Sequence, residues 1–204
     1  MADTDILSDN LETLLKEDNF QKAYDLVRKW ERDDCNTCGM ISDKLLLLIS
    51  KTYYFNRMYD KAKEYLSRYE LMYPALCHEI EYICQKDKLL ILEEKAARAV
   101  ELIEAALDKP QLEYNKYLLT MYLGKANFWN GNYFEANRYL EKCYRYFMEK
   151  RDLHILGLTV YMMGYIALQR RFFDQAEKYF NEALEYFKKV EKLKEIGNCH
   201  NILA

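Results

Sequence analysis

The sequence predicts an all-α fold built from repeated helix pairs, and two observations support this prediction. The chain has 204 residues but only 6 glycines and 2 prolines. A β-rich protein needs many more turn residues, because glycine supplies the positive φ angles of tight turns. The second observation is self-similarity, since segments in the C-terminal half share one spacing of small and aromatic residues. Repetition of this kind is typical of stacked helical units.

The two most similar segments are TMYLGKANFWNGNYFEANRYLEKCYRYF and TVYMMGYIALQRRFFDQAEKYFNEALEYF. The first carries Gly124, Tyr133, Ala136, Leu140 and Cys143, and 40 residues later the second carries Gly164, Phe173, Ala176, Phe180 and Ala183. Small and bulky residues therefore recur at the same offsets in both segments.

These residues resemble the tetratricopeptide repeat (TPR) family, whose unit is a pair of antiparallel helices, A and B. The family pattern has small residues at positions 8 and 20, glycine near 15, an aromatic at 17, a bulky apolar residue at 24 and alanine at 27. The resemblance implies a right-handed α-solenoid of about five helix pairs plus the first helix of a sixth, in one domain spanning residues 1–204. The repeats then start near Thr4, Asp43, Ile80, Tyr117, Gly157 and Gly197.

The same register makes predictions about packing. The alanines at position 20 should be buried between the paired helices: Ala23, Ala62, Ala99, Ala136 and Ala176. Tyrosines at template positions should fill the core: Tyr53, Tyr59, Tyr69 and Tyr133. In the third repeat, Lys86 and Asp87 occupy positions that should be apolar and small, so the register could slip there. Repeats longer than the family's commonest unit suggest that the helices overrun by about one turn.

The C-terminal segment GNCHNILA matches the opening of another helix A. We interpret the chain as cut from a longer protein, because a solenoid usually covers its last apolar edge with a polar capping helix. The alternative is that this segment is itself the capping helix. An exposed edge here would also allow a homodimer.

Composition excludes several classes of protein. The net charge of −3 argues against nucleic-acid binding, which usually leaves a basic surface. The longest purely apolar run, Leu45 to Ile49, is far shorter than the ~20 residues of a membrane span. The acidic N-terminus has no secretory signal, and six cysteines without one are typical of reduced thiols. We therefore expect a cytoplasmic protein.

The most motif-like chemistry is Cys35-Asn-Thr-Cys38-Gly39, whose spacing occurs in zinc and redox sites. Zinc needs four ligands, and the sequence has no second pair at this spacing, so the alternative is a loop with two incidental thiols. The three histidines are scattered, and no Ser–His–Asp or Cys–His arrangement follows from their spacing. We expect no enzyme activity and no cofactor.

The TPR resemblance implies a concave binding groove lined by helix A positions 2, 5, 9 and 12. The residues assigned to this partner-binding groove are Lys51, Tyr54, Met121, Lys125, Phe128, Tyr161 and Tyr165. Amphipathic rings beside a cation suit contact with a peptide. The alternative is that neighbouring repeats cover them. Some TPR domains clamp the tails of chaperones through a pattern of lysine and asparagine residues. This pattern is missing from the first three repeats, and also from the second to fourth repeats.

The favoured function is therefore a repeat domain that binds a protein or peptide, as the sensor or docking part of a larger signalling or transcription-regulatory protein. Longer repeats of this kind resemble those of bacterial regulators. The alternative is a structural scaffold subunit of a multi-protein assembly. A third hypothesis is a metal-dependent redox switch that uses Cys35 and Cys38.

Overall fold

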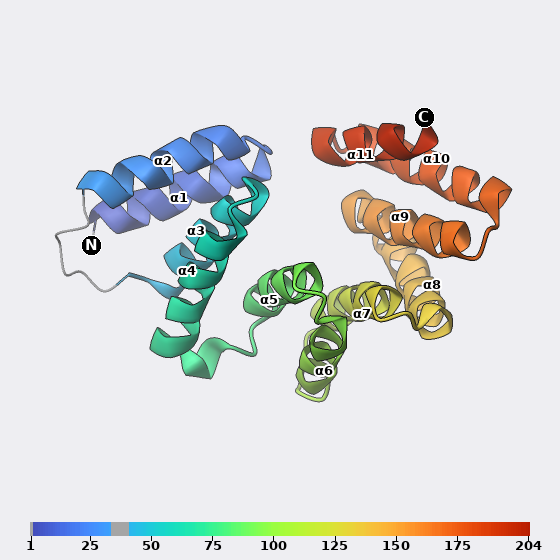
Figure 1. Cartoon of the computed structure of the whole chain (residues 1–204), viewed down its shortest axis with the longest axis horizontal. Helices are drawn as coiled ribbons and strands as arrows, with labels where there is room; N and C mark the ends of the chain where they lie inside the picture. Colours follow the sequence, from blue (N-terminus) through green and yellow to red (C-terminus); the bar gives the residue numbers. More distant parts are fainter. Residues whose placement is uncertain (1, 34–40) are drawn as a thin grey trace. The chain divides into compact units, whose positions relative to one another are not determined.

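The computed structural model describes residues 2–33 and 41–204, which fold into helices without any strand (Figure 1). The α-helices are α1 (Ala2–Lys16), α2 (Phe20–Asp33), α3 (Asp43–Phe55), α4 (Tyr59–Met72), α5 (Ile80–Leu92), α6 (Ala96–Leu107), α7 (Glu113–Trp129), α8 (Tyr133–Lys150), α9 (Leu153–Gln169), α10 (Phe173–Lys189) and α11 (Leu193–Leu203). A short 3₁₀ helix, Pro74–Leu76, precedes α5. None of the described helices is both long and apolar enough to span a bilayer. The predicted all-α fold of paired helices is confirmed.

The helix starts follow the predicted register closely. Helices α3 and α5 begin at Asp43 and Ile80, as expected, whereas α7, α9 and α11 begin one turn before the predicted starts. Local capping explains the extra turn in α9, because the Asp152 side chain accepts a hydrogen bond from the Ile155 amide at 3.1 Å. The predicted overrun by about one turn therefore occurs in the C-terminal repeats.

The turn between paired helices is the same in every pair. One residue in each adopts a positive φ: Asp18, Arg57, Glu94, Gly131 and Arg171. All five occupy position 15, where the TPR pattern has glycine, but only Gly131 is a glycine. The turn closes through a bond back into the preceding helix, as from the Phe172 amide to the Ala167 carbonyl at 2.9 Å.

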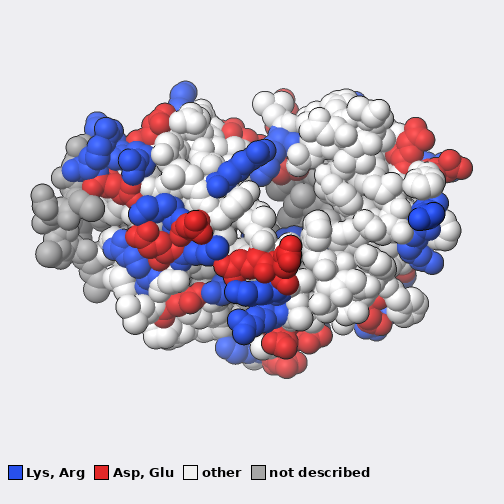
Figure 2. Space-filling view, viewed as in Figure 1, with Lys and Arg blue, Asp and Glu red and all other residues white. Residues whose placement is uncertain are grey.

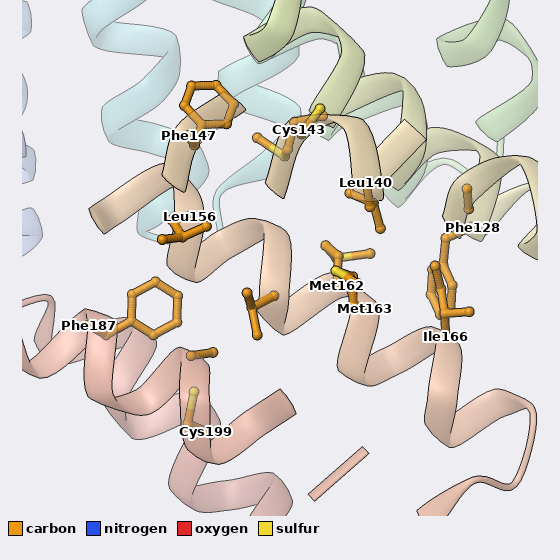
Figure 3. Packing of buried hydrophobic residues seen from close by; sticks show 14 of the residues in the cluster. Phe128, Leu140, Cys143, Phe147, Leu156, Met162, Met163, Ile166, Phe187 and Cys199 are labelled. Atoms are coloured by element: carbon orange, nitrogen blue, oxygen red, sulfur yellow. The ribbon is translucent and has the colours of Figure 1, made fainter. Parts of the chain in front are cut away.

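The helices form two compact units, Met1–Leu89 and Leu90–Ala204. The N-terminal unit holds α1 to α4 and most of α5, and its largest fully buried side chains include Tyr53 and Tyr69. The C-terminal unit holds α6 to α11. Figure 3 shows α9 at its centre, with Leu140 and Phe147 of α8 on one side and Phe187 of α10 on the other. The single domain expected over residues 1–204 stays a prediction.

The predicted interhelix alanines are confirmed as core residues. Ala23, Ala62, Ala99 and Ala136 are fully buried, and Ala176 is 2% exposed. Two position-8 glycines are needed for the same close approach. A Cβ atom on Gly124 would lie 2.9 Å from Leu140 Cγ, and one on Gly164 would lie 2.7 Å from a ring carbon of Phe180. Alanine and glycine at these positions therefore let the two helices of a pair pack closely against each other.

The third repeat keeps its register despite its polar residues. Helix α5 begins at Ile80 as predicted, and Asp87 is fully buried at the position where a small residue is expected. Lys86 is half-buried, and its Nζ lies 2.7 Å from Glu70 Oε1 on α4. The ion pair with Glu70 stabilises the charged lysine at this position, so the helix keeps the predicted register.

Candidate functional site

The seven predicted groove residues divide between the two units, and each group is described by itself. Lys51 and Tyr54 lie on α3 in the N-terminal unit. The other five lie on α7 and α9 in the C-terminal unit. Because the C-terminal group brings aromatic side chains from two helices together, it is the stronger candidate for a binding surface.

Two of the predicted groove residues belong to the core instead. The side chains of Met121 and Phe128 are only 3% and 5% exposed. The Phe128 ring lies 5.6 Å from the Tyr133 ring and 6.0 Å from the Tyr165 ring, measured between centroids. A partner cannot reach a side chain that its own chain covers. The assignment of Met121 and Phe128 to the groove is therefore wrong.

Tyr161 and Tyr165 form the centre of the candidate site. They lie one turn apart on α9, with their rings edge to face at 5.1 Å and their hydroxyl oxygens 3.3 Å apart. Each ring also packs at 5.5 Å against Phe180 of α10. Both side chains are half-buried. Burial, followed by the bond to Tyr165, raises the pKa of Tyr161 well above its usual value, so it stays a neutral phenol that can donate or accept a hydrogen bond.

Lys125 adds a cation on the neighbouring helix. Its Nζ lies 5.2 Å from the centroid of the Tyr122 ring on the same helix, which is the geometry of a cation–π contact. Tyr122 occupies position 6, which the groove pattern of positions 2, 5, 9 and 12 omits, so the sequence reading missed it. Lys125, one turn later on the same helix, was the sequence signal that could have pointed to Tyr122. We call Tyr122, Lys125, Tyr161 and Tyr165 the tyrosine surface.

Charged side chains are sparse on part of the C-terminal unit. Figure 2 shows few of them over α9 and α11 on the face turned to the viewer. The helix sequences agree, because α9 has no acidic residue in its first turn and no basic residue in its last turn. On a surface with few charged side chains, recognition depends on aromatic contact and on a few hydrogen bonds.

The N-terminal pair lies in a more polar setting. The Tyr54 ring packs at 5.7 Å against Tyr59, and Lys88 of α5 places its Nζ 5.8 Å from the centroid of the Tyr54 ring. Burial, together with Tyr59 and Asp87, raises the pKa of Tyr54 to about 12. Lys51 is half-buried on the same helix as Tyr54. The Lys88 Nζ also lies 5.7 Å from the centroid of the Phe55 ring, so in this group the cation already covers the aromatic side chains beside it.

The core prediction for the template tyrosines is confirmed only in part. Tyr53 is fully buried and Tyr69 is 1% exposed, but Tyr59 is half-buried and Tyr133 is 37% exposed. Tyr133 is the first residue of α8, beside the turn at Gly131, and its ring packs against Phe128 at a tilt of 54°. Placement at the edge of the helix pair therefore leaves much of this ring in solvent.

The proposed metal or redox site at Cys35 and Cys38 lies outside the described residues. Within residues 2–33 and 41–204, no group of three or more histidine, cysteine or acidic side chains is arranged to hold a metal ion. Burial raises the pKa of the Cys143 thiol to about 12 and that of Cys199 to about 11. Because the thiolate is the reactive form, these two cysteines are inert packing residues.

No protein-family model matches the sequence, and no curated protein matches it significantly. Solved structures do match. One is a Pyrococcus horikoshii signal transduction ATPase with numerous domains (STAND) that carries a tetratricopeptide repeat sensor, with 14% identity and a TM-score of 0.65 over 95% of this chain and 31% of that one. PilW, a type IV pilus biogenesis factor, has 13% identity and a TM-score of 0.63 over 98% of this chain and 91% of that one. The APC/C assembly Cut9–Hcn1 has 19% identity and a TM-score of 0.63 over 91% of this chain and 32% of that one.

At these identities the comparisons establish the fold. The chain has the helical-repeat architecture of tetratricopeptide repeat proteins, as the resemblance of its sequence implies. It spans about a third of the length of the matching STAND and Cut9–Hcn1 chains.

Proposed function

We propose that this chain is a protein-interaction domain whose C-terminal unit binds a peptide segment of a partner through the tyrosine surface. One observation carries the proposal: Tyr161 and Tyr165 hold their hydroxyls together at 3.3 Å on rings that remain partly exposed. Rings fixed against the core lose little conformational freedom when a ligand binds, so they make good anchors. Lys125 would attract a carboxylate or a main-chain carbonyl of the ligand. The proposal assigns binding rather than catalysis to the chain.

The wider role is part of the same proposal. The matching STAND protein carries its repeats as a sensor, which supports a sensor or docking part of a signalling or transcription-regulatory protein. We also keep the expectations of a cytoplasmic location, of no nucleic-acid or membrane partner, and of a possible homodimer through the C-terminal edge. Leu193 on α11, which is 74% exposed, is the side chain that such a homodimer would cover.

The alternative function is a structural scaffold subunit. It is supported by the likeness to Cut9–Hcn1, which belongs to a multi-protein assembly. A scaffold would use a broad surface, so the loss of one hydroxyl pair would change its binding little. A peptide site would depend on that pair.

The test begins with peptides selected from a random library on the immobilised chain. Their affinities are then measured by fluorescence anisotropy for Tyr161→Phe/Tyr165→Phe and for Lys125→Glu. Phenylalanine keeps the packing on Phe180 and removes only the hydroxyls, so the variant should stay folded. We expect binding to weaken about 5- to 20-fold, as for the loss of one or two hydrogen bonds.

Lys142→Glu is the matched control, because Lys142 is exposed on α8 and outside the tyrosine surface. It should leave the affinity unchanged. Equal affinities for the wild type and both surface variants would contradict the peptide site. A loss of affinity confined to Lys142→Glu would move the site elsewhere.

A further inference from the structure

A carboxylate lies between two tyrosines on the B helices of the C-terminal unit. The hydroxyls of Tyr144 on α8 and Tyr186 on α10 both donate to Oε1 of Glu182 on α10, at 3.2 Å and 3.0 Å. Both rings pack against the apolar core of the unit, and all three side chains are half-buried. We call these three residues the Glu182 cluster. It holds a negative charge between two anchored rings that remain partly exposed.

The carboxylate of Glu182 keeps one oxygen for a further donor. Both tyrosine hydroxyls bond Oε1, and the two oxygens of a carboxylate together accept about four hydrogen bonds. Burial and Glu182 itself raise the pKa of both tyrosines above its usual value, so both remain neutral donors to Oε1. The remaining capacity of the carboxylate is therefore at Oε2.

The charge of Glu182 is not neutralised by its own chain. Within residues 2–33 and 41–204, no lysine or arginine forms an ion pair with it. Lys189, on the same helix, places its Nζ 5.8 Å from the centroid of the Tyr186 ring instead. This contact shows that the rings of the cluster receive cations.

The N-terminal unit contains the same chemistry in a completed form. Glu31 Oε1 accepts the hydroxyls of Tyr53 and Tyr65, at 2.6 Å and 2.7 Å. The other oxygen of Glu31 lies 3.3 Å from Nη1 of Arg28. A second guanidinium, that of Arg68, lies 5.1 Å from the centroid of the Tyr65 ring. Where the chain completes such a cluster itself, guanidinium groups thus occupy both the second carboxylate oxygen and a ring face.

The two clusters differ in what they leave open. The residue three positions before Glu31 is Arg28, whereas the residue three positions before Glu182 is Tyr179, which brings no charge. The two tyrosines bonded to Glu31 are buried, whereas the two bonded to Glu182 are partly exposed. The Glu182 cluster therefore lacks the cation of its counterpart and can be reached from outside.

We propose that the Glu182 cluster binds an arginine side chain of a partner protein. The guanidinium donates to Oε2 of Glu182 and lies against the exposed part of the tyrosine rings. Arginine suits both contacts, because its planar group pairs with a carboxylate and stacks on an aromatic face. The cluster lies on α8 and α10 and is distinct from the tyrosine surface on α7 and α9, so each site can be tested without the other.

The test uses three short probes with the complete chain: acetyl-Gly-Arg-Gly-amide and the same peptide with citrulline or lysine in place of arginine. Each is titrated into ¹⁵N-labelled protein and followed by amide chemical shifts. We expect the arginine probe to shift the amides of Tyr144, Glu182 and Tyr186. It should bind about threefold more tightly than the citrulline probe, which has nearly the same shape without the charge. The lysine probe should bind more weakly than the arginine probe, because an ammonium cannot stack on a ring while it pairs with the carboxylate.

Glu182→Gln tests the carboxylate. Glutamine keeps an oxygen that accepts the tyrosine hydroxyls, so circular dichroism should show an unchanged fold while the arginine and citrulline probes bind equally. Glu185→Gln is the matched control, because Glu185 is exposed on the same helix and pairs with Lys188 at 3.0 Å. It removes the same charge and should keep the preference for arginine.

Three outcomes would overturn the proposal. The first is that the wild type shows no shifts at the cluster, or binds the arginine and citrulline probes equally; this comparison does not depend on the folding of any variant. The second is that the preference for arginine survives Glu182→Gln. The third is that the lysine probe binds as tightly as the arginine probe, which would exclude a site for a guanidinium.

Discussion

The two units fill the contact between paired helices with different chemistry. In the N-terminal unit, position 8 of the second repeat is Ser50, whose hydroxyl donates to the Ala62 carbonyl at 2.7 Å and accepts from Gln85 Nε2 at 3.3 Å. In the C-terminal unit, the same position is Gly124 or Gly164, and a leucine or phenylalanine side chain covers it. One unit thus joins its helices by directed hydrogen bonds, and the other by close apolar contact.

A larger polar cluster strengthens this contrast. Glu31 on α2 accepts hydrogen bonds from the hydroxyls of Tyr53 at 2.6 Å and Tyr65 at 2.7 Å, and its other oxygen lies 3.3 Å from Arg28. Burial and the bond to Glu31 raise the pKa of both tyrosines well above their usual value. Directed bonds of this kind fix which side chains meet, but they leave an unsatisfied group when one partner is lost. Apolar packing accepts one apolar side chain in place of another of the same size, but it is destabilised by a change in side-chain volume.

The largest effect is expected from removing the acceptor in the N-terminal unit. Glu31→Ala should lower the free energy of unfolding by about 3 kcal/mol, because two tyrosine hydroxyls lose a charged partner. Urea denaturation followed by circular dichroism measures this loss. Glu31→Leu combined with Tyr53→Phe and Tyr65→Phe should recover most of it, since no polar group is then left unpaired. A triple variant no more stable than Glu31→Ala would show that packing, not hydrogen bonding, holds this cluster.

In the C-terminal unit, added volume should matter instead. Gly164→Ala places a methyl group against the Phe180 ring, and overpacking of this kind costs about 1–3 kcal/mol. The higher helix propensity of alanine offsets about 1 kcal/mol of this cost, so we expect a net loss of stability of up to about 2 kcal/mol in thermal or urea denaturation.

Gly197→Ala is the control for this substitution. No atom lies within 4 Å of a Cβ built on Gly197, in the interior of α11. This variant should therefore gain up to about 1 kcal/mol. If both variants changed stability in the same direction, the ring contact at Gly164 would not be the cause.

The turns should respond alike in both units. Arg57 and Arg171 hold φ angles of 62°, which favour glycine. The left-handed conformation costs a non-glycine residue about 1–2 kcal/mol, which a glycine does not pay. Part of this gain is lost again, because glycine gives the unfolded chain more conformational entropy. Arg57→Gly and Arg171→Gly should each stabilise the chain by about 0.5–1 kcal/mol in urea denaturation. If only one of the two variants is stabilised, contacts of the arginine side chain, and not the backbone conformation, determine the change in stability.

The smallest expected effect concerns acid. Lys16 and Lys44 lower the pKa of Glu12 from 4.5 to about 2. Because the pKa is lower in the folded state, this stabilisation is complete above about pH 5 and is lost as the pH falls toward 2. The Glu12 side chain is 36% exposed and those of Lys44 and Lys16 are 48% and 73% exposed, so solvent screens the contribution. Glu12→Gln should slightly reduce the fall in melting temperature between pH 5 and pH 2. If the variant shows the same pH dependence as the wild type, this prediction is contradicted.

The fold was predictable because the signals that specify it are short-range. Alanine and glycine recur at the spacing of paired helices, so the register of α3 and α5 follows from the sequence even where Asp87 breaks the pattern. The non-glycine turns were not predictable. Asp18, Arg57, Glu94 and Arg171 carry no local mark of a positive φ, which the surrounding helix pair imposes.

The candidate site was predictable only in part, because exposure depends on neighbouring helices. Tyr161 and Tyr165 were assigned to the groove from their helix positions, and both are half-buried, so their role in binding stays a prediction. Met121 and Phe128 match the same helix positions but are covered by adjacent side chains, which a pattern along one helix cannot reveal.

The two tryptophans of the chain have a practical consequence for spectroscopy. Trp30 lies on α2 in the N-terminal unit, and Trp129, at the end of α7, belongs to the C-terminal unit. Each unit thus carries its own intrinsic fluorophore, in different surroundings, because Trp30 is half-buried and Trp129 is 56% exposed. Trp30→Phe or Trp129→Phe leaves a single tryptophan, so emission excited at wavelengths that the 19 tyrosines do not absorb then reports the melting of one unit at a time without any attached dye.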